Sequence, residues 1–255
     1  MIGRVTAFLY GVFCYLVFFA TFLYAVAFLG DFGAIKSIDS GTETPLGEAL
    51  AINAALLGLF AVQHSVMARP WFKRVWTRIV PPAVERSTYV LFSSLAMILL
   101  FWQWRPMGLS VWSVEDAAVR AVIWGVYAFG WLLLLAATFL INHFDLFGLR
   151  QVYLHLLGRP YTGLEFRTPG LYRYVRHPIY VGWLCIFWAT PQMTAAHLVF
   201  AIATTGYILM AIRWEERDLI SMHGDRYRLY REQVPGLVPL SLKKKRERQA
   251  VAAGD

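Results

Sequence analysis

Two short stretches of this chain place charged and aromatic side chains beside apolar sequence. Residues 173–183 read RYVRHPIYVGW, so two arginines and a histidine meet a proline directly before an apolar run. Residues 213–218 read RWEERD and follow a second apolar run with adjacent glutamates. Such side chains suit a charged, nucleotide-like cofactor, because adenine stacks on aromatic rings and carboxylates pair with ribose hydroxyls and an ammonium group. No GxGxxG motif follows a predicted strand and no Walker motif occurs, so the site would not be of the Rossmann type.

The composition around these stretches is that of a membrane protein. Of the 255 residues, 58% are hydrophobic and 16% are charged, and the mean hydropathy is +0.50, whereas soluble domains carry about 25% charged residues. Apolar windows at 5–30, 46–68, 89–104 and 117–141 are predicted to span the membrane. The first window is too long for a secretory signal. Residues 178–213 are too long for one crossing and are interrupted by TPQMT at 190–194, which predicts a helical hairpin.

Lysine and arginine are distributed unevenly between the connections. Residues 31–48 hold one lysine and four acids, whereas residues 69–86 hold five basic residues and one acid. Residues 105–116 are again poor in basic residues, and residues 143–177 carry five arginines and two acids. Because cytoplasmic loops are enriched in Lys and Arg, the second and fourth connections and both termini are predicted to face the cytoplasm. The formal charge of +8 follows this pattern and does not indicate nucleic-acid binding.

The polar residues of the spans gather at this predicted cytoplasmic end, and ionisable groups near membrane depth usually mark a functional site that faces the bundle interior. We therefore expect an all-α integral membrane protein, a bundle of five to six transmembrane helices with a cytosol-facing cofactor pocket. The two cysteines lie inside apolar windows, so neither a disulfide framework nor a metal site is predicted. Four span glycines are candidates for close helix contacts: Gly58, Gly125, Gly130 and Gly206.

The two C-terminal motifs resemble a known family. GLYRYVRHPIYVGW at 170–183, a hydrophobic hairpin, and RWEERDLISMHGDRYRLYREQVPGLVP at 213–239 are together similar to the C-terminal signature of the isoprenylcysteine carboxyl methyltransferase superfamily of membrane methyltransferases. The resemblance implies S-adenosylmethionine as cofactor, with Pro178 fixing the bend into the fifth span. The cofactor-binding residues that it implies are Tyr174, Val175, Arg176, His177, Tyr180, Glu215 and Glu216.

The upstream half is similar to a narrower group. AVQHSVMARPWFKRVW at 61–76, PPAVERSTYVLFSSL at 81–95 and TFLINHFDLFGLRQVY at 138–153 resemble the bacterial methanethiol S-methyltransferases, which make dimethyl sulfide, and their NnrU-like relatives. This resemblance implies a multi-pass protein of the bacterial inner membrane that methylates a small thiol. We expect one domain over 1–255, with a four-span part (1–142), a cofactor-binding part (143–240) and a basic tail (241–255) that contains KKKRER.

Methyl transfer to sulfur requires a thiolate, and small thiols are weakly acidic, so a base is expected. His64, between Gln63 and Ser65, is the first candidate, because imidazole titrates near neutral pH. His143 is the second, with Asp145 as a carboxylate partner for its imidazolium. Either histidine could instead hold two helices together by hydrogen bonds. The catalytic candidates are completed by Glu85 and Arg86, which with Tyr89 enter the third span from the same end and could position the substrate or form a salt-bridged helix start.

Two other readings stay open at this point. The same chemistry could act on a larger lipophile, such as an isoprenylcysteine carboxylate or a lipid amine. In a different class, His64, His143 and His177 could be axial ligands in a haem or quinone membrane protein. The oligomeric state does not follow from the sequence.

Overall fold

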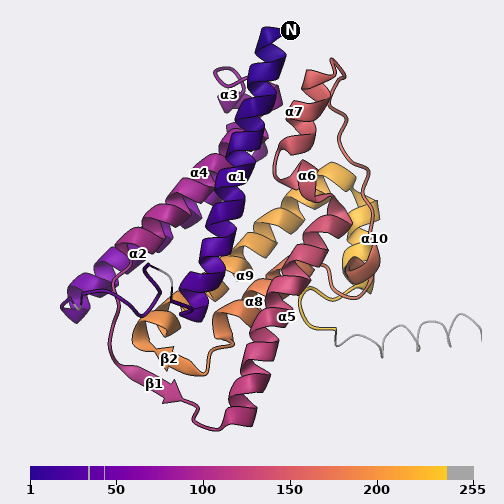
Figure 1. The fold of residues 1–255 in the computed structure, drawn as a ribbon. Helices are drawn as coiled ribbons and strands as arrows, with labels where there is room; N and C mark the ends of the chain where they lie inside the picture. The colour runs from indigo at the N-terminus through magenta and orange to yellow at the C-terminus, as the bar shows by residue number, and fades with distance from the viewer. Residues whose placement is uncertain (34, 43, 240–255) are drawn as a thin grey trace, which may run out of the picture.

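Five long helices make up most of the molecule. The computed structural model describes residues 1–33, 35–42 and 44–239. The long helices contain 22 to 29 residues, or about 33–44 Å at 1.5 Å per residue, which is enough to cross a hydrocarbon core. They are α1 (Ile2–Gly30), α2 (Leu46–Ala68), α4 (Pro82–Gln103), α5 (Ala117–Ile141) and α9 (Ala195–His223) (Figure 1). The chain is a multi-pass membrane protein, and the predicted helical bundle is confirmed.

Hydropathy alone located two of the spans well. The bounds of α2 and α5 coincide with the apolar windows at 46–68 and 117–141. Helix α4 begins at Pro82, well before the predicted window at 89–104, because its first two turns are too polar to register as apolar sequence. Proline is favourable at this position, because the N–H of the first helical residue has no acceptor within the helix and its absence costs no hydrogen bond. Glu85 and Arg86 are therefore part of the span's own helix.

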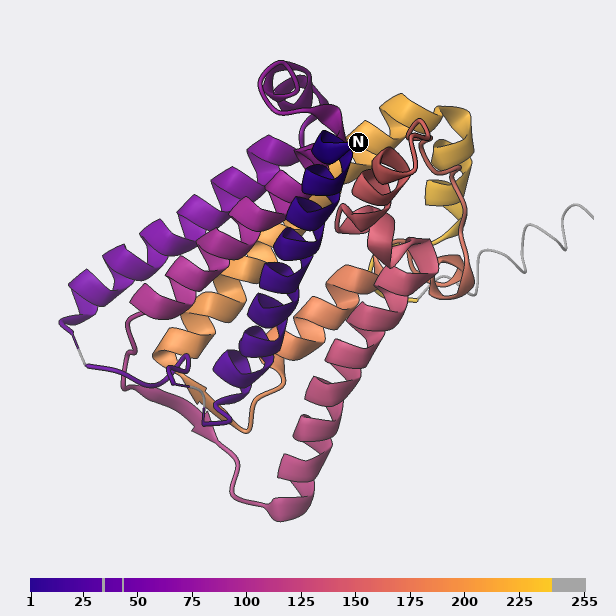
Figure 2. The same cartoon turned by 45° about the horizontal axis from the view of Figure 1, so that its top comes forward.

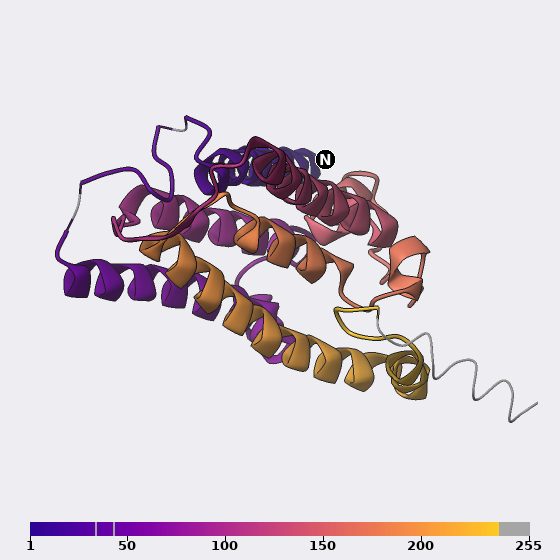
Figure 3. The same cartoon turned by 90° about the horizontal axis from the view of Figure 1, so that it is seen from below.

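The spans form layers. Seen from below, α1 and α5 lie on one side and α2 and α9 on the other, with α4 and the short helix α8 (Pro178–Trp188) between them (Figure 3). Helix α4 contacts both α1 and α2, and α8 contacts both α5 and α9. The middle layer can therefore present side chains to both outer layers.

Short elements distinguish the two ends of the bundle. The N-terminus, α3 (Pro70–Trp76), α7 (Leu149–Leu156) and α10 (Asp225–Gln233) lie toward one end (Figures 1 and 2), and the brief helices α6 (His143–Leu146) and η1 (Gly170–Arg173) belong to the connection after α5. At the opposite end β1 (Ser110–Ser113) pairs antiparallel with β2 (Gln192–Thr194). The span ends predicted to form a polar layer do meet at one end of the molecule, which we call the α7 end.

The predicted hairpin is present, and its two arms are unequal. Helix α8 has 11 residues, or about 16 Å, and cannot cross the hydrocarbon core alone. The chain then continues without helix to β2, whose backbone pairs with β1 instead of facing lipid. Helix α9, with 29 residues, returns along the full height. As a result the start of α8 and the C-terminal part of α9 lie at the same level.

A close glycine contact fixes α8 against α5. A Cβ on Gly130 would come within 2.9 Å of the Gly182 carbonyl oxygen, and a Cβ on Gly182 within 2.8 Å of the Gly130 oxygen, so only glycine fits at this crossing. The prediction for Gly130 is confirmed. It is wrong for Gly58, Gly125 and Gly206, where an added Cβ would meet no described atom within 4 Å.

Aromatic packing fills the half of the bundle next to the β1–β2 pair. Phe28 and Trp104 are fully buried, and Trp104 contacts Phe200 edge-on at 5.5 Å between ring centroids. Beyond this core the hydroxyl of Thr194, the N-cap of α9, donates to the carboxylate of Asp39 in the α1–α2 loop. This end is closed by packing, whereas the polar side chains of interest gather at the α7 end.

Candidate active site

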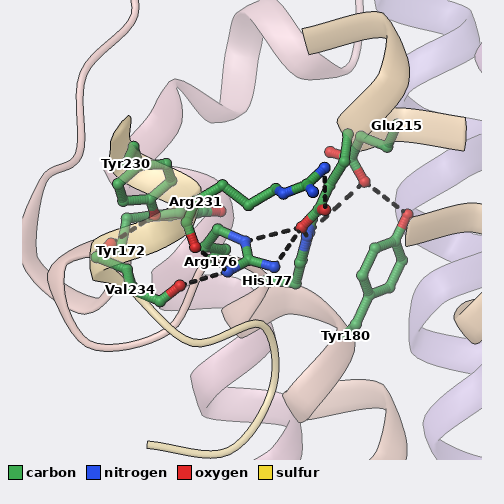
Figure 4. Close-up of polar contacts among 9 residues, drawn as sticks. Tyr172, Arg176, His177, Tyr180, Glu215, Tyr230, Arg231 and Val234 are labelled. Atoms are coloured by element: carbon green, nitrogen blue, oxygen red, sulfur yellow. Dashed lines mark hydrogen bonds and ion pairs between the residues drawn. The ribbon is translucent and has the colours of Figure 1, made fainter. Parts of the chain in front are cut away.

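The RYVRHPIYVGW and RWEERD stretches come together in one cluster. Arg176, His177 and Tyr180 at the start of α8 face Glu215 and Glu216 on α9, and we call these five residues the Arg–Glu cluster (Figure 4). Arg176 Nε donates to Glu216 Oε1 at 2.8 Å, and Nη2 forms an ion pair with the same oxygen at 2.7 Å. His177 Nε2 donates to this oxygen at 3.0 Å. Because Pro178 is the first residue of α8, His177 stands at its N-cap and points across to α9.

The two adjacent glutamates have different surroundings. Glu216 is 8% exposed and is enclosed by Arg176 and His177, with Arg231 at 3.8 Å from its second oxygen. The Glu215 side chain is 44% exposed. It accepts a hydrogen bond of 3.0 Å from the Tyr180 hydroxyl and has His177 Nδ1 at 3.8 Å. Glu216 is thus satisfied by the protein, and Glu215 has capacity left for a ligand.

A C-terminal segment that belongs to the 213–239 motif, but to which the sequence analysis assigned no role, completes this cluster. The backbone N–H groups of Arg176 and His177 donate to the carbonyls of Pro235 and Gly236 at 2.9 and 3.1 Å. Arg176 Nη1 also donates to the carbonyls of Arg231 and Val234. We call residues 234–236 the C-terminal strap (Figure 4). A main-chain acceptor has no side-chain signature, although the PG in VPGLVP marks a non-helical segment.

Other predicted cofactor residues lie at the edge of this cluster. Tyr174 is 68% exposed, and the backbone N–H groups of Tyr174 and Val175 donate to the Leu171 carbonyl. Tyr172 on the preceding turn is held by the Tyr230 hydroxyl, which donates to its carbonyl at 2.6 Å. The structure therefore groups Arg176, His177, Tyr180 and the glutamates, and leaves Tyr174 facing outward.

A second polar cluster lies between α2, α4 and α9. The imidazole of His64 has the Ser93 hydroxyl 3.1 Å from Nδ1 and the Tyr89 hydroxyl within 3.1 Å of its ring nitrogens. The hydroxyls of Ser65 and Tyr207 lie 3.0 Å apart. We call these five residues the hydroxyl cluster. Sequence reasoning did not assign Ser93 and Tyr207, since a hydroxyl within a span is indistinguishable from ordinary helix packing until the partner helix is known.

The two clusters are neighbours. Tyr207 of the hydroxyl cluster and Glu215 of the Arg–Glu cluster both lie on α9, eight residues or about two helical turns apart, so the two clusters border a common region. Arg86 is placed over the Tyr89 ring, with its guanidinium carbon 5.5 Å from the centroid. The region therefore contains hydroxyls and one imidazole, bordered by carboxylate on one side and guanidinium on the other.

Cationic groups dominate the hydroxyl-cluster side. Burial, together with the neighbouring guanidiniums of Arg86 and Arg69, lowers the pKa of the Lys73 ammonium. Arg69 pairs with Asp218 at 2.8 Å and so joins α2 to α9. A buried oxygen of Glu85 has no hydrogen-bond partner among the described residues. An anion bound here would lie in a favourable field.

His143 occupies a different environment from the one expected. Its Nε2 lies 2.9 Å from the Tyr15 hydroxyl and its Nδ1 lies 2.9 Å from the Thr138 hydroxyl. The ring is buried and stacks on Phe139 at 4.3 Å between centroids. The predicted pairing with Asp145 is wrong, because that carboxylate pairs with Arg150 at 2.8 Å. Both ring nitrogens are used to join α1 to the end of α5, which is the geometry of a helix-linking histidine.

The histidines do not converge on one centre. His64, His143 and His177 each contact different partners, and among residues 1–33, 35–42 and 44–239 no three His, Cys, Asp or Glu side chains are grouped as metal ligands. A multi-pass bundle whose RHPxY and EE motifs meet at one end of the spans is the arrangement expected of a membrane methyltransferase.

Comparison with known proteins agrees with this class. The profile of the family described as phospholipid methyltransferase matches residues 124–226. The chain is 55% identical over 243 residues to the methanethiol S-methyltransferase of Crocosphaera subtropica, covering 95% of each chain. It is 53% identical over 236 residues to that of Mycobacterium tuberculosis, covering 92% of this chain and 97% of the relative. It is 33% identical over 233 residues to Nurim of Xenopus laevis, covering 80% and 79%. No solved structure matches significantly.

The chain therefore belongs to the same family of membrane methyltransferases as these bacterial enzymes. The enzyme class predicted from the motifs is confirmed, and the methyl donor of this class is S-adenosylmethionine. The residues present fit that cofactor. The half-exposed carboxylate of Glu215 offers acceptor capacity to hydroxyl or ammonium groups, and it lies beside Tyr180 at the start of α8.

Proposed function

We propose that this protein transfers the methyl group of S-adenosylmethionine to methanethiol and produces dimethyl sulfide. The observation that carries the substrate is the identity of 53–55% over more than nine tenths of the chain to several methanethiol S-methyltransferases. The observation that carries the site is the meeting of the Arg–Glu and hydroxyl clusters in one polar region. A small thiol fits beside such a region because it needs no extended apolar binding surface.

The Arg–Glu cluster would hold the cofactor. Glu215 would accept hydrogen bonds from it, and Tyr180 would fix the orientation of that carboxylate. Glu216 acts differently: it holds Arg176 and His177, and these in turn hold the C-terminal strap through main-chain hydrogen bonds. Val175 and Tyr174 would contribute from the edge. This arrangement supports the prediction that residues 143–240 form the cofactor-binding part of a single domain, whose basic tail at 241–255 lies outside the described residues.

When bound, S-adenosylmethionine supplies an electrophilic methyl group, whose bond to the sulfonium sulfur breaks as its bond to the thiol sulfur forms. The protein's tasks are to align the thiol, exclude water and favour its thiolate form. A cysteine-like thiol has a pKa near ~8.5, so at neutral pH most of it is protonated. His64 could accept the proton, and Ser93 and Tyr89 would hold its ring.

The surrounding charges would assist this step. The guanidiniums of Arg86, over Tyr89, and of Arg69, paired with Asp218, would favour an anion over a neutral thiol. Glu85, with one unpartnered oxygen, would hold these cations in place or receive the proton onward. His143 would serve as a helix link, because both its nitrogens are engaged away from the Arg–Glu cluster.

We infer that the α7 end faces the cytosol. The Lys- and Arg-rich connections lie at that end, and S-adenosylmethionine is made in the cytosol. Cysteines introduced near Lys73 or Arg159 should therefore resist a membrane-impermeant maleimide in intact cells and react in permeabilised cells. Strong labelling of intact cells would reverse the orientation.

Activity can be tested directly. Membranes that contain the protein are incubated with S-adenosylmethionine and methanethiol, and dimethyl sulfide is measured in the headspace. Membranes with equal amounts of the Glu215→Gln variant are the matched control, and a parallel reaction offers a prenylated cysteine. We expect dimethyl sulfide well above the control and no methyl ester. Methyl ester without dimethyl sulfide would instead support the larger lipophilic substrate, and neither product would contradict the proposal.

A further inference from the structure

A cavity of about 400 Å³ lies apart from the site just described, between α1 and the α6–α7 connection. It falls within the ~300–1,000 Å³ range of ligand pockets. Its lining is apolar except at one edge, and it consists of Phe8, Val12, Asn142, Phe144, Leu149, Arg150 and Tyr153. Phe144 and Tyr153 are about half exposed. The cavity is thus an open groove in the outer surface of the bundle, where lipid surrounds a membrane protein.

The groove has a defined direction along the membrane normal. Helices α1 and α7 lie side by side (Figures 1 and 2). They run antiparallel, because Gly11 of α1 packs on Val152 of α7, whereas the Arg4 guanidinium reaches Gly158 just beyond the end of α7. Arg4, Phe8 and Val12 follow one another at intervals of four residues, so they share one face of α1. Along this face a cation at the membrane edge is followed by apolar side chains toward the interior.

Two arginines lie close to the groove but outside its lining: Arg4 is one helical turn before Phe8 and reaches Gly158, which Arg159 follows in the chain. Arg4 and Arg159 are exposed at this end, and in the part of the chain that the structure describes neither forms an ion pair with an acid. Arg150 lines the groove itself and is neutralised by Asp145 at 2.8 Å. Two arginines thus remain for an anion at the level where lipid headgroups lie.

We propose that this groove binds one anionic phospholipid, with an acyl chain against Phe8, Val12 and Phe144 and the phosphate at Arg4. The order of cation and apolar surface matches the order of headgroup and chain in a bilayer. A neutral zwitterionic lipid would fill the same apolar groove and would gain less from the two arginines. The proposal does not depend on the thiol substrate or on the Arg–Glu cluster, which lies on other helices.

Native mass spectrometry of the purified, delipidated protein tests the proposal. Phosphatidylglycerol and phosphatidylcholine with identical acyl chains are titrated separately. We expect one phosphatidylglycerol to bind more tightly than phosphatidylcholine. Arg4→Gln should weaken phosphatidylglycerol roughly fivefold, the usual contribution of one basic residue near a membrane surface, and should leave phosphatidylcholine unchanged. Arg120→Gln, at the start of α5 near the β1–β2 end, is the charge control and should change neither.

A second variant fills the groove. Val12→Trp should abolish binding of the single phosphatidylglycerol, whereas Val122→Trp, on the exposed face of α5, should not. Equal affinity for the two lipids in the native protein, or unchanged phosphatidylglycerol binding in both Arg4→Gln and Val12→Trp, would overturn the proposal. Dimethyl sulfide formation is measured on the same samples, so loss of the methyltransferase activity is distinguished from loss of the lipid site.

Discussion

The Arg–Glu cluster and the hydroxyl cluster are neighbours built on opposite principles. The first is made of ionised groups whose bonds are mostly satisfied within the protein: Glu216 accepts hydrogen bonds from Arg176 and His177 at 2.8 and 3.0 Å and forms an ion pair with Arg176 at 2.7 Å. The second is made of neutral hydroxyls around His64, with guanidiniums at its border. Ion pairs fix the positions of their side chains, whereas hydroxyls and an imidazole can donate and accept protons. In the function proposed above, holding the cofactor and activating the substrate therefore depend on different sets of side chains.

The largest expected effect comes from removing the centre of the first cluster. Glu216→Ala leaves two buried cationic or donor groups without their partner, which typically costs about 3–5 kcal/mol. Thermal unfolding in detergent and cofactor calorimetry should both show severe loss. Asp225→Ala is the matched control, because that carboxylate is 85% exposed in its pair with Arg228 and should change little. A Glu216→Ala protein with native stability would show that the cluster is not structural.

Substitution of His64 in the hydroxyl cluster should change the turnover rate and leave cofactor binding largely unchanged. If His64 removes the thiol proton, His64→Ala lowers turnover by roughly 10² to 10⁴ with cofactor affinity nearly intact. Raising the pH should partly restore the rate, because more substrate arrives as thiolate. A helix-linking role would instead reduce stability and cofactor binding together, with no rescue by alkali.

His143 provides the contrast to that result. Its two hydroxyl partners and aromatic neighbours predict that His143→Ala lowers the unfolding temperature, while turnover per folded protein stays near normal and no alkaline rescue appears. Thermal scans paired with headspace assays measure both quantities. A turnover loss as large as that of His64→Ala, rescued at high pH, would make His143 the base.

Glu215 sharpens the comparison from within the first cluster. Because successive helical residues point about 100° apart, Glu215 faces Tyr180 and solvent while Glu216 faces Arg176. Glu215→Gln should weaken cofactor binding by about 10–100-fold, the value of one or two hydrogen bonds to a charged group, with an unchanged unfolding temperature. Equal losses of stability in Glu215→Gln and Glu216→Gln would contradict the assignment of a ligand-binding role to Glu215 and a structural role to Glu216.

The smallest effect is expected far from both clusters. Burial raises the pKa of Asp39 to about 6, and the Thr194 hydroxyl only partly offsets this. Between about pH 4 and pH 6 the folded protein holds a proton on this carboxyl that the unfolded chain has already lost. The stability of the folded protein therefore falls as the pH rises through this range. Asp39→Asn should therefore unfold a few degrees higher than the native protein at pH 7.5, and the difference should vanish near pH 4. A constant difference across this range would contradict the assignment.

Sequence predicted the fold where hydropathy decides it. The bounds of α2 and α5 follow from their apolar runs, and the family follows from RHPIY and EER, whose spacing is local. The unequal α8–α9 hairpin was not predictable, because the length that α8 lacks is supplied by β2, whose partner β1 lies about eighty residues upstream. Strand pairing between segments so far apart in the chain produces no local hydrophobic periodicity from which it could be predicted.

The candidate site also has parts that could be predicted from the sequence and parts that could not. Motif side chains such as Arg176 and Glu216 were found from their types, and their roles stay predictions. The C-terminal strap was missed because it contributes carbonyl oxygens, which every residue has. The Asp145 pairing was misjudged because the left-handed backbone at Asn142, with φ of 106°, begins a tight turn that directs the carboxylate to Arg150.

The C-terminal strap also determines the order in which the Arg–Glu cluster can be completed during synthesis. His177 donates to the carbonyl of Gly236, which is synthesised 59 residues later (236 − 177). At about 5–20 residues per second, roughly 3–12 s separate the two on the ribosome. During that interval α8 can enter the bundle and meet its partner on α5, while Arg176 and His177 still lack their final acceptors. The Arg–Glu cluster, which is the proposed cofactor site, therefore gains these main-chain hydrogen bonds only after α8 and α9 have both been synthesised.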